Sequence, residues 1–174
     1  QRLQVPPGLS QVQREAQREA FEAQLQLAAE LGRPVSMHCV KAFGEVFDML
    51  RAPTTARAAV PVYLHSFGGK AGMLNSLLKM KPAGPTTARA TTSGELLYFG
   101  FSAAVNLRSP KTRKLLAEIP PARLLLESDL EGPPAAVEAG LAEMLRVVAE
   151  VKGWSLEEAA RITAENAHRF YALD

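Results

Sequence analysis

The apolar residues of this sequence follow two different spacings in turn. Short continuous apolar runs predict strands at residues 34–38, 60–65, 96–101 and 123–128. Runs of this kind carry apolar residues on both faces, which is typical of strands buried between layers of helices. Around these runs, apolar residues recur every three to four positions, and this spacing predicts helices at residues 10–31, 42–51, 71–80, 109–118, 135–152 and 155–170.

Polar residues at the helix ends support these boundaries. Ser10 followed by Gln13 has the spacing of a capping box, in which each side chain caps the backbone N–H of the other residue. Ser109-Pro110 predicts a helix start with proline in the first turn. In the first helix, the stripe that we expect to be buried consists of Val12, Ala16, Ala20, Leu25, Ala28 and Leu31.

The alternation of helices and strands favours an α/β fold in which parallel strands are joined by right-handed crossovers. Gly68-Gly69 after the second strand is too short for a dinucleotide-binding fingerprint, so a barrel is the better interpretation. A complete eight-stranded barrel takes about 250 residues. The chain has 174 residues and four predicted strands. We therefore expect residues 1–174 to form one α/β domain, the C-terminal portion of an incomplete barrel.

An incomplete barrel leaves a strand edge without a neighbour. We expect this edge to stay open, to be covered by the irregular lead-in Gln1–Leu9, or to pair with another chain. The stretch Pro-Thr-Thr-Ala-Arg-Ala occurs at residues 53–58 and again at residues 85–90. We interpret both copies as loop, the second within a loop insertion at residues 82–93.

Composition narrows the class of protein. Hydrophobic residues make up 47% and charged residues 22% of the chain, as in ordinary soluble globular proteins. A net charge of +2 is too small to argue for nucleic-acid binding by itself. The single cysteine, Cys39, excludes an internal disulfide and fits a reducing compartment. The sequence shows neither a membrane-length apolar run nor a signal peptide. We expect a cytoplasmic protein without membrane contact, with the nucleus as the alternative.

Three of the predicted strands end in residues that bind metals. His38, His65 and Asp129 close the first, second and fourth strands, and the carboxyl ends of parallel strands meet at one face. Imidazoles with a carboxylate bind Zn²⁺ or a similar ion, which polarises a phosphoryl or carbonyl oxygen and acidifies water. One such histidine alone is more often a hydrogen-bonded rim residue, and Asp129 alone could cap the following turn. The coincidence of three favours a metal site.

Other residues near the strand ends are candidates for supporting roles. Glu127 shares the face of Asp129 by strand alternation, so an acid/base role and a structural hydrogen bond are equally plausible. Phe67 and Ser102 follow strand ends and, together with Glu127, are candidates for substrate binding; core packing is the alternative for Phe67.

Two further residues are interpreted as structural. Cys39 is next to His38 and points to the opposite face of its strand, which predicts a small buried hydrophobic residue. His168 lies in the last helix, where a structural or surface role is the better interpretation.

Together, these stretches resemble the TatD family of metal-dependent hydrolases. The resemblance is carried by Pro34-Val-Ser-Met-His38, His65-Ser-Phe-Gly-Gly69 and Leu125-Leu-Glu-Ser-Asp129. The closing Glu165-Asn-Ala-His-Arg-Phe170 is similar to the terminal Asn-x-x-Arg-Phe helix of the family. The resemblance implies a TIM-type barrel, one or more divalent metal ions (Zn, Mg or Mn), and deoxyribonuclease or other phosphoesterase activity on DNA. It also implies that His38 and His65 are metal ligands and that Asp129 binds metal and handles the attacking water.

The sequence departs from the family pattern in its first part. The His-x-His pair of the first family strand and the Gly-Glu-x-Gly-Leu-Asp setting of the third do not occur in it. Two explanations stay open: a truncated sequence, or a natural variant that has lost half of the site.

These departures leave three hypotheses. The first is a metal-dependent deoxyribonuclease, and the second is a non-catalytic scaffold or binding protein derived from the barrel. The third is a metal hydrolase of small amides or esters, because related barrels share strand-end histidine and aspartate ligands.

Overall fold

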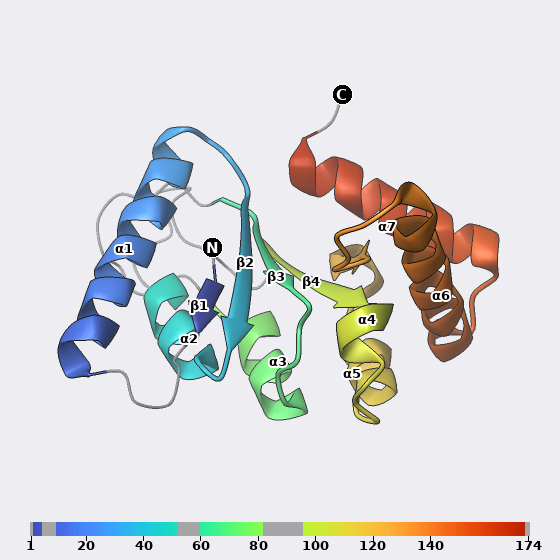
Figure 1. Cartoon of the computed structure of the whole chain (residues 1–174), viewed down its shortest axis with the longest axis horizontal. Helices are drawn as coiled ribbons and strands as arrows, with labels where there is room; N and C mark the ends of the chain where they lie inside the picture. Colours follow the sequence, from blue (N-terminus) through green and yellow to red (C-terminus); the bar gives the residue numbers. More distant parts are fainter. Residues whose placement is uncertain (1, 5–9, 52–59, 82–95, 173–174) are drawn as a thin grey trace. The chain divides into compact units, whose positions relative to one another are not determined.

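The computed structural model describes residues 2–4, 10–51, 60–81 and 96–172 (Figure 1). The chain divides into two compact units, the first comprising residues 1–64 and 75–97 and the second comprising residues 65–74 and 98–174. The chain passes from one unit to the other at three points: in strand β3 (Val62–His65) just before His65, in helix α3 (Ala71–Leu78) just after Leu74, and in strand β4 (Leu97–Ser102) just after Leu97. The expected loop insertion at 82–93 and both copies of the repeated hexapeptide lie outside the described residues.

The first unit is built on parallel strands. Strands β1 (Arg2–Gln4), β2 (Val35–Val40) and β3 are neighbours in that order. Strand β1 pairs in parallel with β2, with Arg2 opposite His38 and Gln4 opposite Val40. The Val35 N–H donates to Pro61 O at 2.9 Å and so joins the start of β2 to the residue before β3. The order and direction that the sequence predicts for its first two strands are therefore present in this unit.

Strand β1 corrects the expectation that Gln1–Leu9 is irregular throughout. Residues 2–4 are extended and paired with β2, although three residues of mixed polarity carry almost no strand signal. The reason is tertiary, because an edge of β2 offers backbone groups that a passing segment can satisfy. Residues 2–4 therefore cover the edge of β2, which is one of the three alternatives expected for the open edge.

Two helices lie wholly within the described part of the first unit. Helix α1 (Gln11–Glu30) precedes β2 in the chain, and helix α2 (Phe43–Arg51) follows β2 and contacts it. The capping box is confirmed, since Gln13 N donates to Ser10 Oγ at 3.2 Å and Ser10 N donates to Gln13 Oε1 at 2.9 Å. The expected stripe is confirmed at Leu25 but is otherwise out of phase: Phe21 and Ala29 are the other buried residues of α1, while Val12 and Leu31 are exposed.

Cys39 behaves as the sequence predicts. Its side chain is buried in β2, and this burial raises the pKa of the thiol to about 11. At neutral pH the thiol is therefore protonated and behaves as a small apolar group rather than as a nucleophile.

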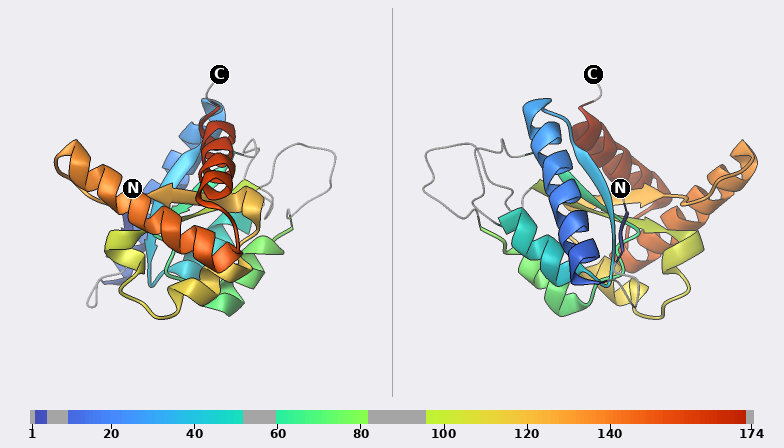
Figure 2. Two further views of the ribbon diagram at one scale, coloured as in Figure 1. Left: turned by 90° about the vertical axis from the view of Figure 1, so that its right-hand side faces the viewer. Right: turned by 60° about the vertical axis from the view of Figure 1, so that its left-hand side comes forward.

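The second unit joins two strands to a group of helices. Strand β4 pairs in parallel with β5 (Leu124–Glu127), in a register that places Ser102 opposite Glu127 at the carboxyl end of both strands. The Phe67 N–H, two residues beyond β3, donates to Gly100 O at 2.8 Å. Helix α6 (Pro134–Lys152) and helix α7 (Leu156–Tyr171) pack on β5 and on each other, as Figure 2 shows in orange and red.

The short helices of this unit differ from the prediction. Helix α4 (Ala103–Asn106) was not expected, and helix α5 begins at Thr112 rather than at Ser109 and ends at Glu118. Ser109 Oγ instead accepts a hydrogen bond from Lys111 N, so its capping chemistry serves a turn. Helix α3 (Ala71–Leu78) matches its expected position. None of the helices in the described part of the chain has the length and apolar character needed to cross a membrane.

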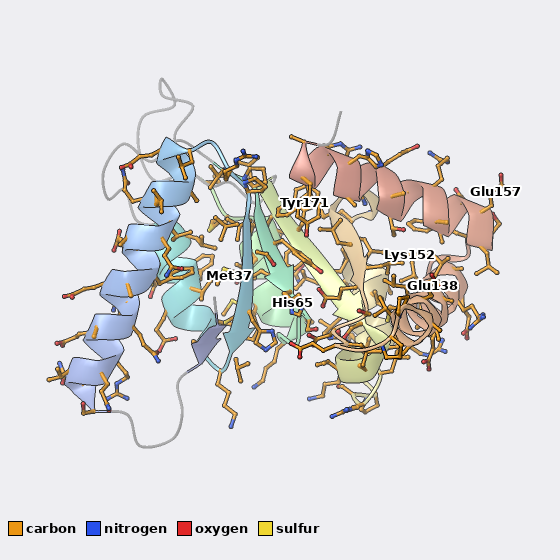
Figure 3. All side chains as sticks on the ribbon, turned by 45° about the horizontal axis from the view of Figure 1, so that its top comes forward. Met37, His65, Glu138, Lys152, Glu157 and Tyr171 are labelled. Atoms are coloured by element: carbon orange, nitrogen blue, oxygen red, sulfur yellow. The ribbon has the colours of Figure 1, made fainter. Side chains whose placement is uncertain are left out.

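Polar side chains tie α7 to the start of β5 and the end of α6 to the end of α5. In α7, Asn166 Nδ2 donates to Pro121 O at 2.7 Å and to Leu124 O at 2.8 Å, at the start of β5. Lys152, labelled in Figure 3, donates from Nζ to Ala117 O and Ile119 O at the end of α5. Burial lowers the pKa of Lys152, and the two carbonyls satisfy its buried ammonium group. Asn166 therefore has a structural role in the closing motif, and His168 is exposed, in line with the structural or surface role expected for it.

Gly69 is required by the packing of the loop after β3. A Cβ atom at this position would lie 2.5 Å from Phe67 Cζ and 2.8 Å from Phe67 Cε2. The Phe67 ring cannot move away easily, because it is 1% exposed and packs edge-on against Phe99 at 5.0 Å between ring centroids. Gly68, by contrast, has Ser66 O as its nearest neighbour at 3.9 Å.

We predict that Gly69→Ala lowers the free energy of unfolding by about 1–3 kcal/mol, the usual cost of overpacking a core. The matched control Gly68→Ala should change it by less than about 1 kcal/mol, because its methyl group meets only ordinary contacts. Urea unfolding of the two variants and the parent chain measures the difference. Equal stability of the two variants would contradict this account of the loop.

Candidate active site at the carboxyl ends of β3 and β5

The site begins where two strands are interrupted by residues with left-handed backbone. Ser66 follows β3 directly and has φ of 44°, and Asp129 lies two residues after β5 and has φ of 53°. Positive φ is costly for residues with a Cβ and occurs often at functional sites. A residue with positive φ cannot continue a strand, so the chain turns at Ser66 and at Asp129 and leaves the sheet.

His65 faces two carboxylates at this turn. The Nε2 atom of His65, which is labelled in Figure 3, lies 3.2 Å from Glu127 Oε2 and 3.6 Å from Asp129 Oδ1. The side chains of His65 and Asp129 are 27% and 29% exposed, while that of Glu127 is 10% exposed. The structure thus brings together one imidazole and two carboxylates, with Asp129 the more accessible of the two acids.

Ser66 connects both carboxylates. Its backbone N–H donates to Glu127 Oε1 at 2.5 Å, and its Oγ donates to the same oxygen at 2.7 Å. The same Oγ lies 3.1 Å from Asp129 Oδ2 and 3.3 Å from Ser102 Oγ. Hydrogen bonds to an ionised acceptor are shorter and stronger than neutral ones. Ser66 therefore holds Glu127 by two donors and reaches Asp129 with the same hydroxyl group.

Ser102 and Asn106 support this arrangement from the end of β4. Ser102 is fully buried and caps α4, since its Oγ accepts from Val105 N at 3.2 Å. Asn106 accepts from Ser102 N at 2.8 Å and donates to Phe67 O at 3.0 Å. A single buried amide thus ties the loop that carries Ser66 to the end of β4.

The structure assigns the remaining sequence-predicted residues to definite places. Phe67 is in the core, packed against Phe99 and Phe101, so core packing is the interpretation that fits its ring. Ser102 contacts other site residues rather than solvent. His38 is half-buried in β2 of the first unit, whereas His65, Glu127 and Asp129 all belong to the second unit.

Ser66 and Asn106 are members of the site that the sequence pattern did not predict. Ser66 stood inside the motif His65-Ser-Phe-Gly-Gly69, but a serine beside a histidine carries no signal of its own. The usable signal was the position directly after a strand end, where a small polar residue can donate its backbone N–H. Asn106 lay in a helix that the periodicity did not predict.

The donor atoms of this cluster suit a divalent metal ion in kind. An imidazole nitrogen and carboxylate oxygens are ligands of Zn²⁺, Mn²⁺ and Mg²⁺ in different proportions. In number they fall short, since no group of three or more His, Cys, Asp or Glu side chains within the described ranges is placed to hold a metal. His65 and Asp129 therefore fit as part of a metal site that needs further ligands.

The proteins to which this chain is similar are described as nucleases and metal-dependent hydrolases. The family model described as TatD related DNase matches residues 9–172. A curated relative named 3'-5' ssDNA/RNA exonuclease TatD, from Musicola paradisiaca, is 32% identical over 170 residues, which are 90% of this chain and 58% of that protein. A relative named uncharacterized metal-dependent hydrolase YabD, from Bacillus subtilis, is 28% identical over 92% of this chain and 60% of that protein.

A solved structure of a TatD homolog has a similar fold. YJJV, a TatD homolog from Escherichia coli K12, superposes with a TM-score of 0.68 at 20% sequence identity, over 98% of this chain and 62% of that chain. This likeness confirms the expected α/β class and the incomplete TIM-type arrangement of parallel strands. The chain spans about 60% of the length of these relatives. Because the family model matches nearly all of its length, the chain belongs to the TatD-related DNase family of hydrolases.

Proposed function

We propose that this chain contributes to a metal-dependent phosphoesterase that hydrolyses phosphodiester bonds of DNA. The observation that carries the proposal is the meeting of His65 and Asp129 from the ends of two strands, both accessible to solvent. Membership of the TatD family supports it, as do relatives that are named a 3'-5' ssDNA/RNA exonuclease and a metal-dependent hydrolase. The name of the exonuclease gives single-stranded DNA and RNA as substrates, and we propose single-stranded DNA for this chain.

The proposed metal ligands are His38, His65 and Asp129, with a divalent ion of the Zn, Mg or Mn group. A bound metal of this kind would polarise a phosphoryl oxygen and acidify a water molecule. His65 presents its Nε2 toward the carboxylates, and Asp129 Oδ1 lies 3.6 Å from it. The proposal that His38 is a metal ligand rests on its position in β2 and on the resemblance to the TatD family.

Asp129 is the proposed general base. A water molecule that attacks phosphorus loses a proton, and an accessible carboxylate can take this proton while the ester oxygen leaves. Asp129 suits this role better than Glu127, because one oxygen of Glu127 already accepts two hydrogen bonds from Ser66. Glu127 then orients its neighbours. Direct substrate binding by Phe67 and Ser102 has less support, since both side chains are buried.

Two alternatives stay open. A non-catalytic scaffold protein would keep the strands without a complete set of ligands, in line with the incomplete donor set among the described residues. A hydrolase of small amides or esters would use the same histidine and aspartate. The proposed location is the cytoplasm, with the nucleus as the alternative.

The first prediction concerns activity. The wild-type chain should shorten a 5′-labelled single-stranded DNA oligonucleotide in the presence of Mn²⁺ or Mg²⁺, and EDTA should stop the reaction. Asp129→Asn should reduce the rate by about 100-fold or more, the usual contribution of a positioned general base. His168→Ala is the matched control, because His168 is exposed on α7 and should leave the rate unchanged.

A wild-type chain that cleaves p-nitrophenyl esters but no DNA would support the small-substrate hydrolase. A folded chain that cleaves neither would support the scaffold. An Asp129→Asn variant as active as the wild type on DNA would remove Asp129 from the mechanism.

The second prediction concerns the metal. His65→Ala and His38→Ala should each abolish binding of Zn²⁺ or Mn²⁺, whereas His168→Ala should bind as the wild type does. Isothermal titration with each metal, supported by elemental analysis of the purified proteins, measures this. Equal metal content in all four proteins would rule out the assigned ligands.

The third prediction concerns association. Strand β5 stands at one end of the strand order, and we propose that this edge pairs with another chain. Light scattering should then give a mass above the 18.8 kDa of one chain, falling on dilution. A constant mass of one chain at all concentrations would contradict pairing.

A further inference from the structure

We propose that Ser66 is the positioning residue of this site: it fixes Glu127 and Asp129 opposite His65 and thereby sets the affinity of the cluster for a divalent cation. The proposal rests on the proposed function in so far as it concerns the cation. Its geometric part, that Ser66 holds the two carboxylates, stands on the hydrogen bonds alone.

Ser66 supplies two hydrogen-bond donors to one carboxylate oxygen. Glu127 Oε1 receives both the backbone N–H and the Oγ of Ser66, which lies 61 residues earlier in the chain. Two donors from one residue fix the direction of a carboxylate better than one donor does, because they restrict its rotation. With Oε1 held in this way, Oε2 is the oxygen that faces His65 Nε2 at 3.2 Å.

The hydroxyl groups of Ser102 and Ser66 direct their hydrogens toward the two acids. Ser66 Oγ carries one hydrogen and lies within hydrogen-bonding distance of both Glu127 Oε1 and Asp129 Oδ2. Ser102 Oγ already accepts from Val105 N, so its own hydrogen can be donated to Ser66 Oγ, 3.3 Å away. The row of hydroxyl groups from Ser102 to Ser66 is thereby polarised toward the two acids.

The backbone conformation of Ser66 also supports a positioning role. Its φ of 44° is unfavourable for serine, yet Ser66 is 5% exposed and its backbone N–H is directed at a carboxylate from another strand. Asn106 holds the next residue, Phe67, through its carbonyl group, and so keeps this turn in place. A left-handed residue maintained by buried contacts at a cluster of acids fits a positioning role.

The backbone also supplies a clean test. Glycine accepts positive φ without cost, so Ser66→Gly keeps the backbone N–H donor, removes only the hydroxyl and should fold at least as well as the parent. Ser109→Gly is the matched control, because Ser109 also uses its Oγ in a local hydrogen bond, with Lys111 N, and does not belong to the cluster of Ser66, Glu127 and Asp129.

The first measurement is titration of Mn²⁺ into the full chain. Ser66→Gly should weaken binding by 10- to 100-fold, the usual effect of removing a group that orients metal ligands. Its thermal unfolding without metal should be unchanged or shifted upward. A merely structural role predicts instead that stability falls, and Mn²⁺ affinity within twofold of the wild type would overturn the proposal.

The second measurement needs no metal and separates this proposal from the proposed function. Urea unfolding of Ser66→Gly, Glu127→Gln and the double variant forms a cycle whose coupling reports on the Ser66–Glu127 contact. We expect coupling of roughly fivefold or more in the unfolding equilibrium constant. If the wild type binds no Mn²⁺ but this coupling is present, the metal function fails and the positioning of Glu127 stands. Absence of coupling would overturn the positioning role whatever the metal does.

Discussion

The hydrogen bonds from Ser66 to Glu127 join the end of β3 to the end of β5, and the rest of the site depends on them. They offset an unfavourable backbone, because a left-handed serine costs about 1–2 kcal/mol and a hydrogen bond to a charged group contributes about 1.5–3 kcal/mol. The balance is favourable only while the turn after β3 keeps its shape. The packing of Gly69 under the Phe67 ring and the hydrogen bond from Asn106 to Phe67 O both serve this turn.

The same interaction gives the two acids different roles. Glu127 is largely buried and accepts from Ser66 with one oxygen, while the other faces His65. Asp129 lies beyond the strand, where a left-handed turn carries it toward solvent. One carboxylate is thus suited to holding the imidazole and the other to meeting a metal or a substrate. This division follows from burial and hydrogen bonding, and the residue types alone do not reveal it.

Left-handed residues recur where strands of this chain end. Lys41 follows β2 with φ of 57°, Ser66 follows β3, and Asp129 follows β5. Each of these turns lies within two residues of the end of a strand and leads the chain away from the sheet. Enzymes with parallel strands use the carboxyl ends of those strands for chemistry, and membership of the TatD-related DNase family agrees with that placement.

The sequence by itself determined the elements whose cause is local. Apolar runs predicted β2 to β5, and the capping box at Ser10 predicted the start of α1. The strand-end pattern indicated His38, His65 and Asp129, of which His65 and Asp129 lie close together. Only the tertiary structure decided what depends on distant partners. Strand β1 forms because β2 offers an edge, the buried face of α1 follows Phe21 rather than Val12, and Ser66 becomes important because Glu127 reaches it from 61 residues away. Periodicity and capping act over a few residues and are therefore legible in a sequence, whereas pairing, burial and long-range hydrogen bonds exist only after the chain has folded.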